Sequence, residues 1–166
     1  YLHVPARQPG FGEGQTMPHS VSHLCSAALG ALALVVSAAT SAAEIGQLKS
    51  AKGEVWIERS GARVPGTVGT RVQTADVVKT GADGSVGMVM VDNSLLSMGP
   101  NSALSLDRLD YDATTQRGRF DTSLAKGSLG VVSGRIAKQS PDAMSVRTPS
   151  AILGVRGTEF AVGVDE

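Results

Sequence analysis

Hydrophobic and polar residues alternate over short stretches through most of the chain after residue 44. The period of two is clearest in EVWIE (54–58) and ALSLDRLDY (103–111), and it is typical of β-strands that bury one face. No stretch after residue 44 repeats its apolar residues at helical spacing between capping residues. The pattern therefore predicts an all-β fold with almost no helix.

Turn residues separate the alternating stretches, and Asp83-Gly84 within GADGS is the strongest tight-turn signal among them. Short strands at this spacing are typical of a β-sandwich or of a β-roll that resembles a solenoid. The glycine-rich, aromatic-poor composition of the same region favours a thin, turn-rich structure. Further strands are expected at 76–80, 86–91, 94–99, 144–148 and 158–164, with two runs between 118 and 136 on either side of Lys126-Gly127.

The chain begins with a different pattern, an apolar run that ends in small residues at 24–43. This is typical of a secretory signal peptide. With Met17 as its start, we expect an upstream or disordered segment at 1–16, a signal peptide at 17–43 and one domain at 44–166. The protein would then be periplasmic or secreted and would contact the membrane only transiently. Retention of the leader as a membrane anchor is the alternative, since 17–23 contains no Lys or Arg.

The predicted domain lacks two residue types that much enzyme chemistry requires. The three histidines and the single cysteine all precede residue 44, which excludes Ser-His-Asp, Cys-His and ordinary zinc sites from the domain. Two carboxylates could still hydrolyse a glycoside, but no pair stands out. We therefore expect no enzyme, no cofactor and no metal site.

Acidic residues cluster at Asp107, Asp110 and Asp112, where a solvated strand end is the default interpretation and a weak Ca²⁺ contact is the alternative. The GADGS segment lacks the ligand order of a calcium loop, so we interpret it as a turn. The 14 basic and 14 acidic residues after residue 43 balance, so the domain has no general attraction for nucleic acid.

Three segments, in order, resemble the FecR domain family: DVVKTGADGS (76–85), KGSLGVVSG (126–134) and RTPSAILGVRGTEF (147–160). The resemblance covers about residues 66–164. It implies the periplasmic domain of an iron-transport regulator, which also has a cytoplasmic anti-sigma segment and one membrane span. In that family the domain receives a signal from an outer-membrane TonB-dependent transporter.

Only a leader precedes the domain here, so the chain is more similar to a stand-alone, exported version. We expect a non-catalytic interaction or ligand-binding module in the bacterial envelope, with an envelope protein or polysaccharide as its partner. Recognition would use strands and turns, including pairing at a sheet edge. The alternatives are the sensory part of an anti-sigma regulator and a structural or adhesive unit of a larger surface protein.

Two places supply candidate binding residues. In the segment 147–160, Pro149, Gly154 and Gly157 indicate a sharp corner. Arg156 would pair there with a carboxylate such as Glu159 or Asp76; the alternative is that Arg156 binds a carboxylate or phosphate of a partner.

Trp56 is the second candidate. It shares a strand face with Glu54 and Glu58, so it is exposed if Val55 and Ile57 face the core. An exposed tryptophan is a contact for a protein or sugar, and packing beneath a loop is the alternative.

Overall fold

A computed structural model describes residues 42–155 and 159–165, without the side chain of Pro141. Residues 17–41 of the expected leader and the candidates Arg156 and Gly157 lie outside the described residues. Within these ranges, no helix has both the length and the apolar character needed to cross a membrane.

The described residues form twelve strands, one short α-helix and one 3₁₀ turn. In chain order these elements are β1 (Glu44–Lys52), β2 (Val55–Arg59), β3 (Ala62–Pro65), β4 (Arg71–Gln73), β5 (Val77–Thr80), β6 (Ser85–Met90), β7 (Leu95–Met98), β8 (Ala103–Tyr111), β9 (Gly118–Val132), α1 (Arg135–Gln139), the 3₁₀ turn η1 (Pro141–Ala143), β10 (Met144–Arg147), β11 (Ile152–Gly154) and β12 (Glu159–Val164).

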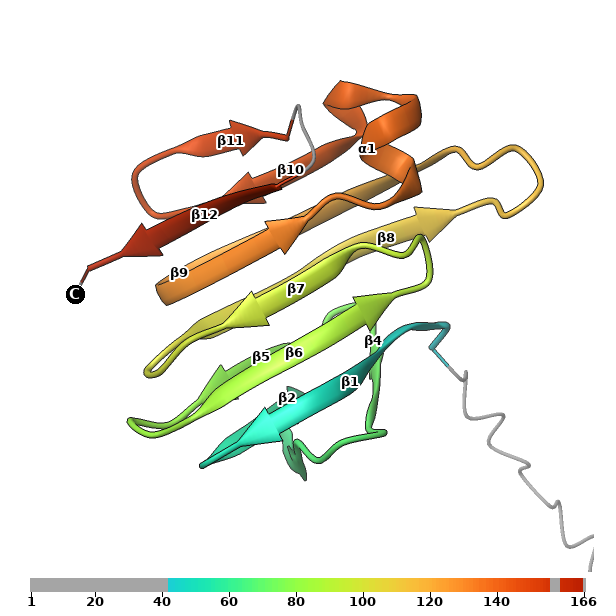
Figure 1. Ribbon diagram of the computed structural model, residues 1–166. Coiled ribbons are helices and arrows are strands. Elements are labelled where there is room, and N and C mark those ends of the chain that lie inside the picture. The colour runs from blue at the N-terminus through green and yellow to red at the C-terminus, as the bar shows by residue number, and fades with distance from the viewer. Residues whose placement is uncertain (1–41, 156–158, 166) are drawn as a thin grey trace, which may run out of the picture. The chain divides into compact units, whose positions relative to one another are not determined.

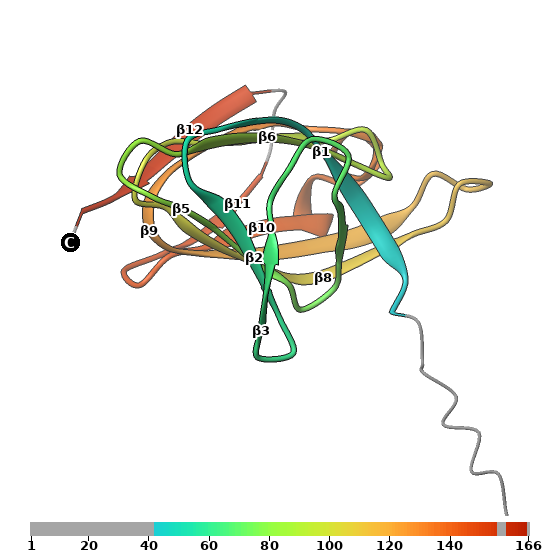
Figure 2. The ribbon, with the colours of Figure 1, turned by 90° about the horizontal axis from the view of Figure 1, so that it is seen from below.

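The strands belong to one curled, mostly antiparallel sheet that forms a half-barrel. Its front layer, in spatial order, is β4-β1-β6-β7-β9-β12, and its back layer is β3-β2-β5-β8-β9-β10-β11. Figure 1 shows β1, β6 and β7 in front of β2, β5 and β8, and Figure 2 shows the layers curling around a common interior. The all-β expectation is confirmed.

The long strand β9 belongs to both layers. Its first part pairs with β8, and its last residues pair with β7 and β12. The strand changes layer near Gly127, which has φ +83. A Cβ there would lie 2.5 Å from the Cα atom of Ser102, so only glycine fits this crossing. The sequence predicted two runs at this place, and the structure joins them into one continuous strand.

Alternation along the strands builds the core between the layers. Apolar side chains point inward from both layers, and the largest fully buried ones include Phe120, Leu48, Ile57, Met88 and Leu104. In β2, Ile57 is buried while Trp56 and Glu58 lie on the outer side. Removing these apolar surfaces from water is the main contribution to the stability of such a fold.

Some elements were not predicted from the sequence: β1, β3, β4, β11 and α1. Strand β1 has two irregularities in its pairing, one between Glu44 and Gly46 and one between Leu48 and Ser50. Each irregularity changes which residues face inward, so the alternation is lost. The remaining elements are only three to five residues long, too short for a periodic pattern.

Candidate functional site

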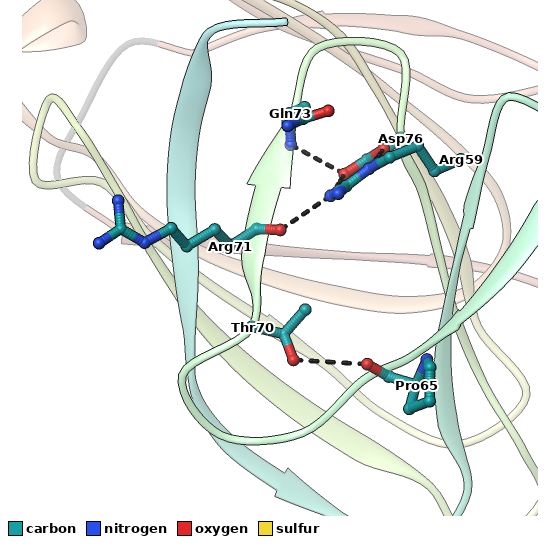
Figure 3. A network of polar contacts seen from close by, with 6 residues as sticks. All are labelled: Arg59, Pro65, Thr70, Arg71, Gln73 and Asp76. Carbon is teal, nitrogen blue, oxygen red and sulfur yellow. Dashed lines mark hydrogen bonds and ion pairs between the residues drawn. The ribbon is translucent and has the colours of Figure 1, made fainter. Parts of the chain in front are cut away.

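A buried ion pair joins the end of β2 to the loop before β5 (Figure 3). The guanidinium of Arg59 donates to both carboxylate oxygens of Asp76, with Nε–Oδ1 at 2.9 Å and Nη2–Oδ2 at 2.7 Å. The Asp76 side chain is 1% exposed and that of Arg59 is 30% exposed. This paired geometry is the strongest form of arginine–carboxylate contact.

Backbone groups complete this corner. Arg59 Nη2 also donates to the carbonyl of Arg71 at 2.8 Å, and the backbone N–H of Gln73 donates to Asp76 Oδ2 at 2.8 Å. The backbone N–H of Leu106 donates to the Asp76 carbonyl. The hydrogen bond to Asp76 raises the pKa of Arg59. We refer to Arg59, Asp76, Gln73 and the carbonyl of Arg71 as the buried corner; their contacts fasten β2 to β4 and β8.

Asp76 was one of the two carboxylates considered as a partner for Arg156. Both of its oxygens accept hydrogen bonds from Arg59. The buried corner therefore has a structural role of its own.

A second candidate group of residues lies on the outer side of the back layer. Five residues lie opposite one another on five adjacent strands and form one row across the sheet. From β3 to β9, this row consists of Pro65, Trp56, Lys79, Ala103 and Lys126. Ala103 has the smallest side chain of this row and stands between two lysines. We refer to this row, together with Arg63 and Glu58, as the Trp56 face.

Charged residues surround the indole ring of Trp56. The Arg63 guanidinium carbon lies 4.1 Å from the ring centroid, within the range of a cation–π contact. Arg63 Nη2 also donates to Glu54 Oε1 at 2.6 Å, and Lys79 Nζ donates to Glu58 Oε1 at 2.7 Å. Trp56 itself is half-buried, so part of the ring is open to a partner.

The hydrogen bond from Lys79 lowers the pKa of Glu58, and the Trp56 side chain contributes in the same direction. Glu58 is therefore a carboxylate at neutral pH and holds Lys79 in place. All four of these charges lie at the surface, and ion pairs of this kind contribute little to folding. Their effect is to fix side chains around the ring.

A hollow of about 480 Å³ opens beside the ring. Trp56 forms part of its wall, together with the small residues Gly81 and Ala103. Lys79, Asn101 and Lys126 supply polar groups at the same hollow. A mostly apolar hollow of this size with a few polar groups is typical of a ligand site or of a pocket for a partner's side chain.

The predicted Asp83-Gly84 turn anchors the start of this region. The Asp83 carboxylate accepts a hydrogen bond from the Glu54 backbone N–H at 3.2 Å. Gly84 is buried, and a Cβ at that position would lie 2.3 Å from the Glu54 carbonyl oxygen. The turn thus packs against the residues just before Trp56.

The C-terminal candidates lie at the other end of the sheet. Pro149 is exposed in the turn between β10 and β11, Gly154 is exposed at the end of β11, and Glu159 is exposed at the start of β12. A Cβ on Gly154 would meet no atom within 4 Å. Because residues 156–158 are not described, the pairing expected for Arg156 stays a prediction.

The acidic residues near the β8–β9 turn are bound by protein groups. Asp107 accepts hydrogen bonds from Ser105 and Ser123, and Asp110 accepts one from Arg108. Asp112 caps its turn, because the N–H of Thr114 donates to it and lowers its pKa. No group of three or more potential metal-ligating side chains occurs in the described ranges.

A wider hollow of about 750 Å³ lies between the start of β1 and the β8–β9 turn, beside Ala43 and Tyr111. It borders the point where the described residues begin. We assign no function to it.

The fold and the geometry of the Trp56 face define a β-domain with a hollow beside a half-buried tryptophan on its back layer. A family model described as "FecR protein" matches residues 76–166, more than half of the chain. The chain therefore belongs to the FecR family. No curated protein and no solved structure matched it.

The family match begins at Asp76, while the structural unit begins earlier. Strand β1 lies between β4 and β6, and β2 pairs with β5. The residues before the match therefore complete the fold, and they supply Trp56, Arg59 and Arg63.

Sequence reasoning identified Trp56 but missed three charged residues beside it or near it. Arg59, Arg63 and Lys79 occupy ordinary surface positions in their patterns. The spacing of Arg63 and Pro65 was the sequence signal that could have identified Arg63. In an antiparallel β2–β3 hairpin, Arg63 lies opposite Glu58 and Pro65 lies opposite Trp56.

Proposed function

We propose that the chain is a non-catalytic interaction module of the bacterial envelope and that it binds its partner through the Trp56 face. Membership of the FecR family supports a role in signalling through protein contacts. The single observation that carries the proposal is the open hollow beside a half-buried tryptophan whose neighbours are held by ion pairs. Tryptophan and arginine are the residues that most often dominate binding energy at interfaces.

The partner is an envelope protein or an envelope polysaccharide. An aromatic ring with adjacent hydrogen-bonding groups suits either one. An exported location follows from the leader expected at residues 17–43 and from the family, and it is part of this proposal. No role is proposed for Arg156 beyond the pairing or partner contact expected from the sequence.

Signalling is the second candidate, since FecR family membership favours the periplasmic sensory part of a membrane regulator. In that case the leader region would be retained as an anchor. Mass spectrometry of the exported protein separates the two forms, because cleavage creates a new N-terminus near Ala43 or Glu44. Recovery of residues 24–43 in the protein from the envelope would favour the regulator.

A photo-crosslinking experiment tests the Trp56 face directly. In one protein, a benzophenone amino acid replaces Ser105, which is two positions from Ala103 along β8 and therefore lies beside the Trp56 face. In a matched protein, the same amino acid replaces Ser97 on the front layer. Each protein is exposed to envelope extract of the source bacterium and irradiated. We expect a crosslinked envelope component from position 105, and we expect Trp56→Ala to remove it.

Protease treatment then distinguishes a protein partner from a polysaccharide. A crosslink from position 105 that persists in full in Trp56→Ala would exclude the tryptophan as a contact. Absence of any envelope component at position 105 would contradict the proposed face.

A further inference from the structure

The indole ring of Trp56 has a different neighbour on each of its two sides. The Arg63 guanidinium carbon, which comes from β3, lies 4.1 Å from the ring centroid. The hollow beside the ring is lined by residues of β5, β8 and β9, and Arg63 does not line it. Because β2 lies between β3 and β5 in the sheet, Arg63 and the hollow are on opposite sides of the ring. A ligand in the hollow therefore meets the indole on the side that Arg63 leaves open.

Ion pairs hold the ring's neighbours in place and balance the charge around it. Arg63 donates to Glu54 at 2.6 Å, and Lys79 donates to Glu58 at 2.7 Å. Lys126, across the hollow, also takes part in an interaction within the protein. Two positive and two negative charges next to the ring give no net attraction for an acidic ligand. The charges therefore favour an uncharged ligand, and fixed side chains lose little freedom when it binds.

Hydroxyl groups and a carboxylate lie beside the hollow on the same outer face. Ser105 and Ser123 lie opposite each other on β8 and β9, and both donate hydrogen bonds to the Asp107 carboxylate. Large exposed hydrophobic side chains lie elsewhere in the described ranges. They are Val68, Val91, Leu95, Val132 and Ile152, and none of them lines the hollow.

This combination fits a sugar chain better than the centre of a protein interface. The buried centre of a protein interface is mostly apolar and poor in charged residues, whereas here one aromatic ring stands among ion pairs. A pyranose ring has an apolar face of C–H groups and a rim of hydroxyls. The C–H hydrogens carry a small positive charge that matches the negative face of an indole. The hydroxyls donate to carboxylates and accept from ammonium and amide N–H groups.

We infer that the Trp56 face binds an uncharged polysaccharide, with one pyranose ring stacked on the open side of the indole. From Trp56 on β2 to Lys126 on β9 the row crosses β5 and β8, a span of roughly 14 Å at about 4.8 Å between strands. This span is longer than one sugar ring, so further rings of the chain would lie over Ala103 and beside Asn101, which both line the hollow. The inference rests on the function proposed for the Trp56 face and selects the polysaccharide from the two partners considered there.

The fluorescence of Trp56, the single tryptophan of the chain, tests the inference. The full chain is titrated with the polysaccharide fraction of the source bacterium's envelope, from which a protease, later inactivated, has removed protein. We expect a saturable change in the emission of the ring. We also expect the affinity to persist in about 0.5 M NaCl, because salt at that concentration screens charge pairs and leaves contacts to an uncharged ligand in place.

Two variants test where the polysaccharide binds. Ala125 is exposed in β9 and lines the hollow, so Ala125→Leu narrows the space for a sugar. Ala161→Leu is the matched control, because Ala161 is exposed on β12 of the front layer. We expect at least tenfold weaker binding in Ala125→Leu, wild-type binding in Ala161→Leu, and unchanged unfolding midpoints in both.

An emission that stays constant during the titration would overturn the inference. So would binding that is lost in about 0.5 M NaCl, or equal affinities of Ala125→Leu and the wild type. Constant emission together with a protease-sensitive crosslink from position 105 would identify a protein partner; the polysaccharide would then be wrong and the function proposed for the Trp56 face would stand. Constant emission without any crosslink from position 105 would contradict both.

Discussion

Two arginines on the same hairpin take part in ion pairs with different consequences. Arg59, at the end of β2, binds Asp76, which is 1% exposed. Arg63, on β3, binds Glu54, and both side chains are more than half exposed. The chemical groups are the same kind in both pairs, and the surroundings decide what each pair does.

Burial makes the Arg59–Asp76 pair part of the fold. A charge removed from water must keep its partner, because loss of one partner leaves the other uncompensated. The pairs on the Trp56 face keep their contact with water, so the fold tolerates their loss. Such a face can therefore exchange its internal contacts for contacts with a partner.

Arg59→Met should produce the largest loss of stability. Among the described residues, it leaves the buried Asp76 carboxylate with the backbone N–H of Gln73 as its remaining hydrogen-bond donor. We expect a loss of about 3 kcal/mol in the free energy of unfolding. Urea denaturation followed by circular dichroism measures this loss. Arg63→Met is the matched control and should leave the midpoint near that of the wild type; equal losses in the two variants would remove the distinction between the regions.

Gly127→Ala should be the next most damaging change. Its left-handed conformation and the approach of Ser102 both exclude a side chain, and we expect a loss of at least about 2 kcal/mol. The same denaturation measurement applies. Gly163→Ala serves as a control, because a Cβ there meets nothing within 4 Å. A stable Gly127→Ala variant would show that β9 changes layer in another way.

Acidification should reveal the contribution of Asp121 to stability, which should be smaller than the losses expected for Arg59→Met and Gly127→Ala. Burial raises its pKa, but the hydrogen bonds from Arg119 and Ser145 outweigh burial, so the pKa lies below its ordinary value. The stabilisation is therefore present above the unfolded-state pKa of about 3.9 and is lost as the pH falls through the lower, folded-state value.

Asp121→Asn removes this contribution. The variant should be less stable than the wild type at pH 7, and the two should converge in strong acid. Denaturation midpoints measured from pH 7 to about pH 2 give the comparison. A difference that grows on acidification would have the wrong sign for this account.

Trp56→Ala should have the smallest effect on stability and a large effect on binding. The side chain is half-buried on an outer face, so we expect a loss of about 1 kcal/mol or less. Capture of envelope components by the immobilised variant should fall at least tenfold. Ile152→Ala is a suitable control, since Ile152 is 68% exposed at the edge of the back layer. Retained capture by Trp56→Ala would mean that the face is a surface without a partner.

The sequence was sufficient to predict strands wherever successive side chains point alternately to water and to the core. It predicted β8 with its observed ends, and most other strands to within two residues, because side-chain alternation is a local property. It also put Trp56 on the strand face opposite to Val55 and Ile57, which is the outer face if those two residues face the core. The layer change of β9 was not predicted, since it depends on the approach of Ser102 to Gly127, 25 positions apart in the chain.

The candidate site was predictable only in part for the same reason. Trp56 could be selected by its type and its strand position. Its contact with Arg63 depends on the β2–β3 hairpin, and the hollow depends on Ala103 of β8 lying between Lys79 and Lys126. Likewise, Arg59 meets Asp76 across 17 positions. No local pattern contains these pairings, and they appear only when the strand order is known.

The most direct test of the Trp56 face uses the fact that Trp56 is the single tryptophan of the chain. Labelling with 5-fluorotryptophan therefore gives one ¹⁹F resonance, which reports the surroundings of this ring alone. Addition of envelope extract should shift or broaden that resonance, and excess unlabelled wild-type protein should restore it while unlabelled Trp56→Ala should not. A resonance that stays unchanged while crosslinking shows bound partner would contradict the claim that the partner contacts Trp56.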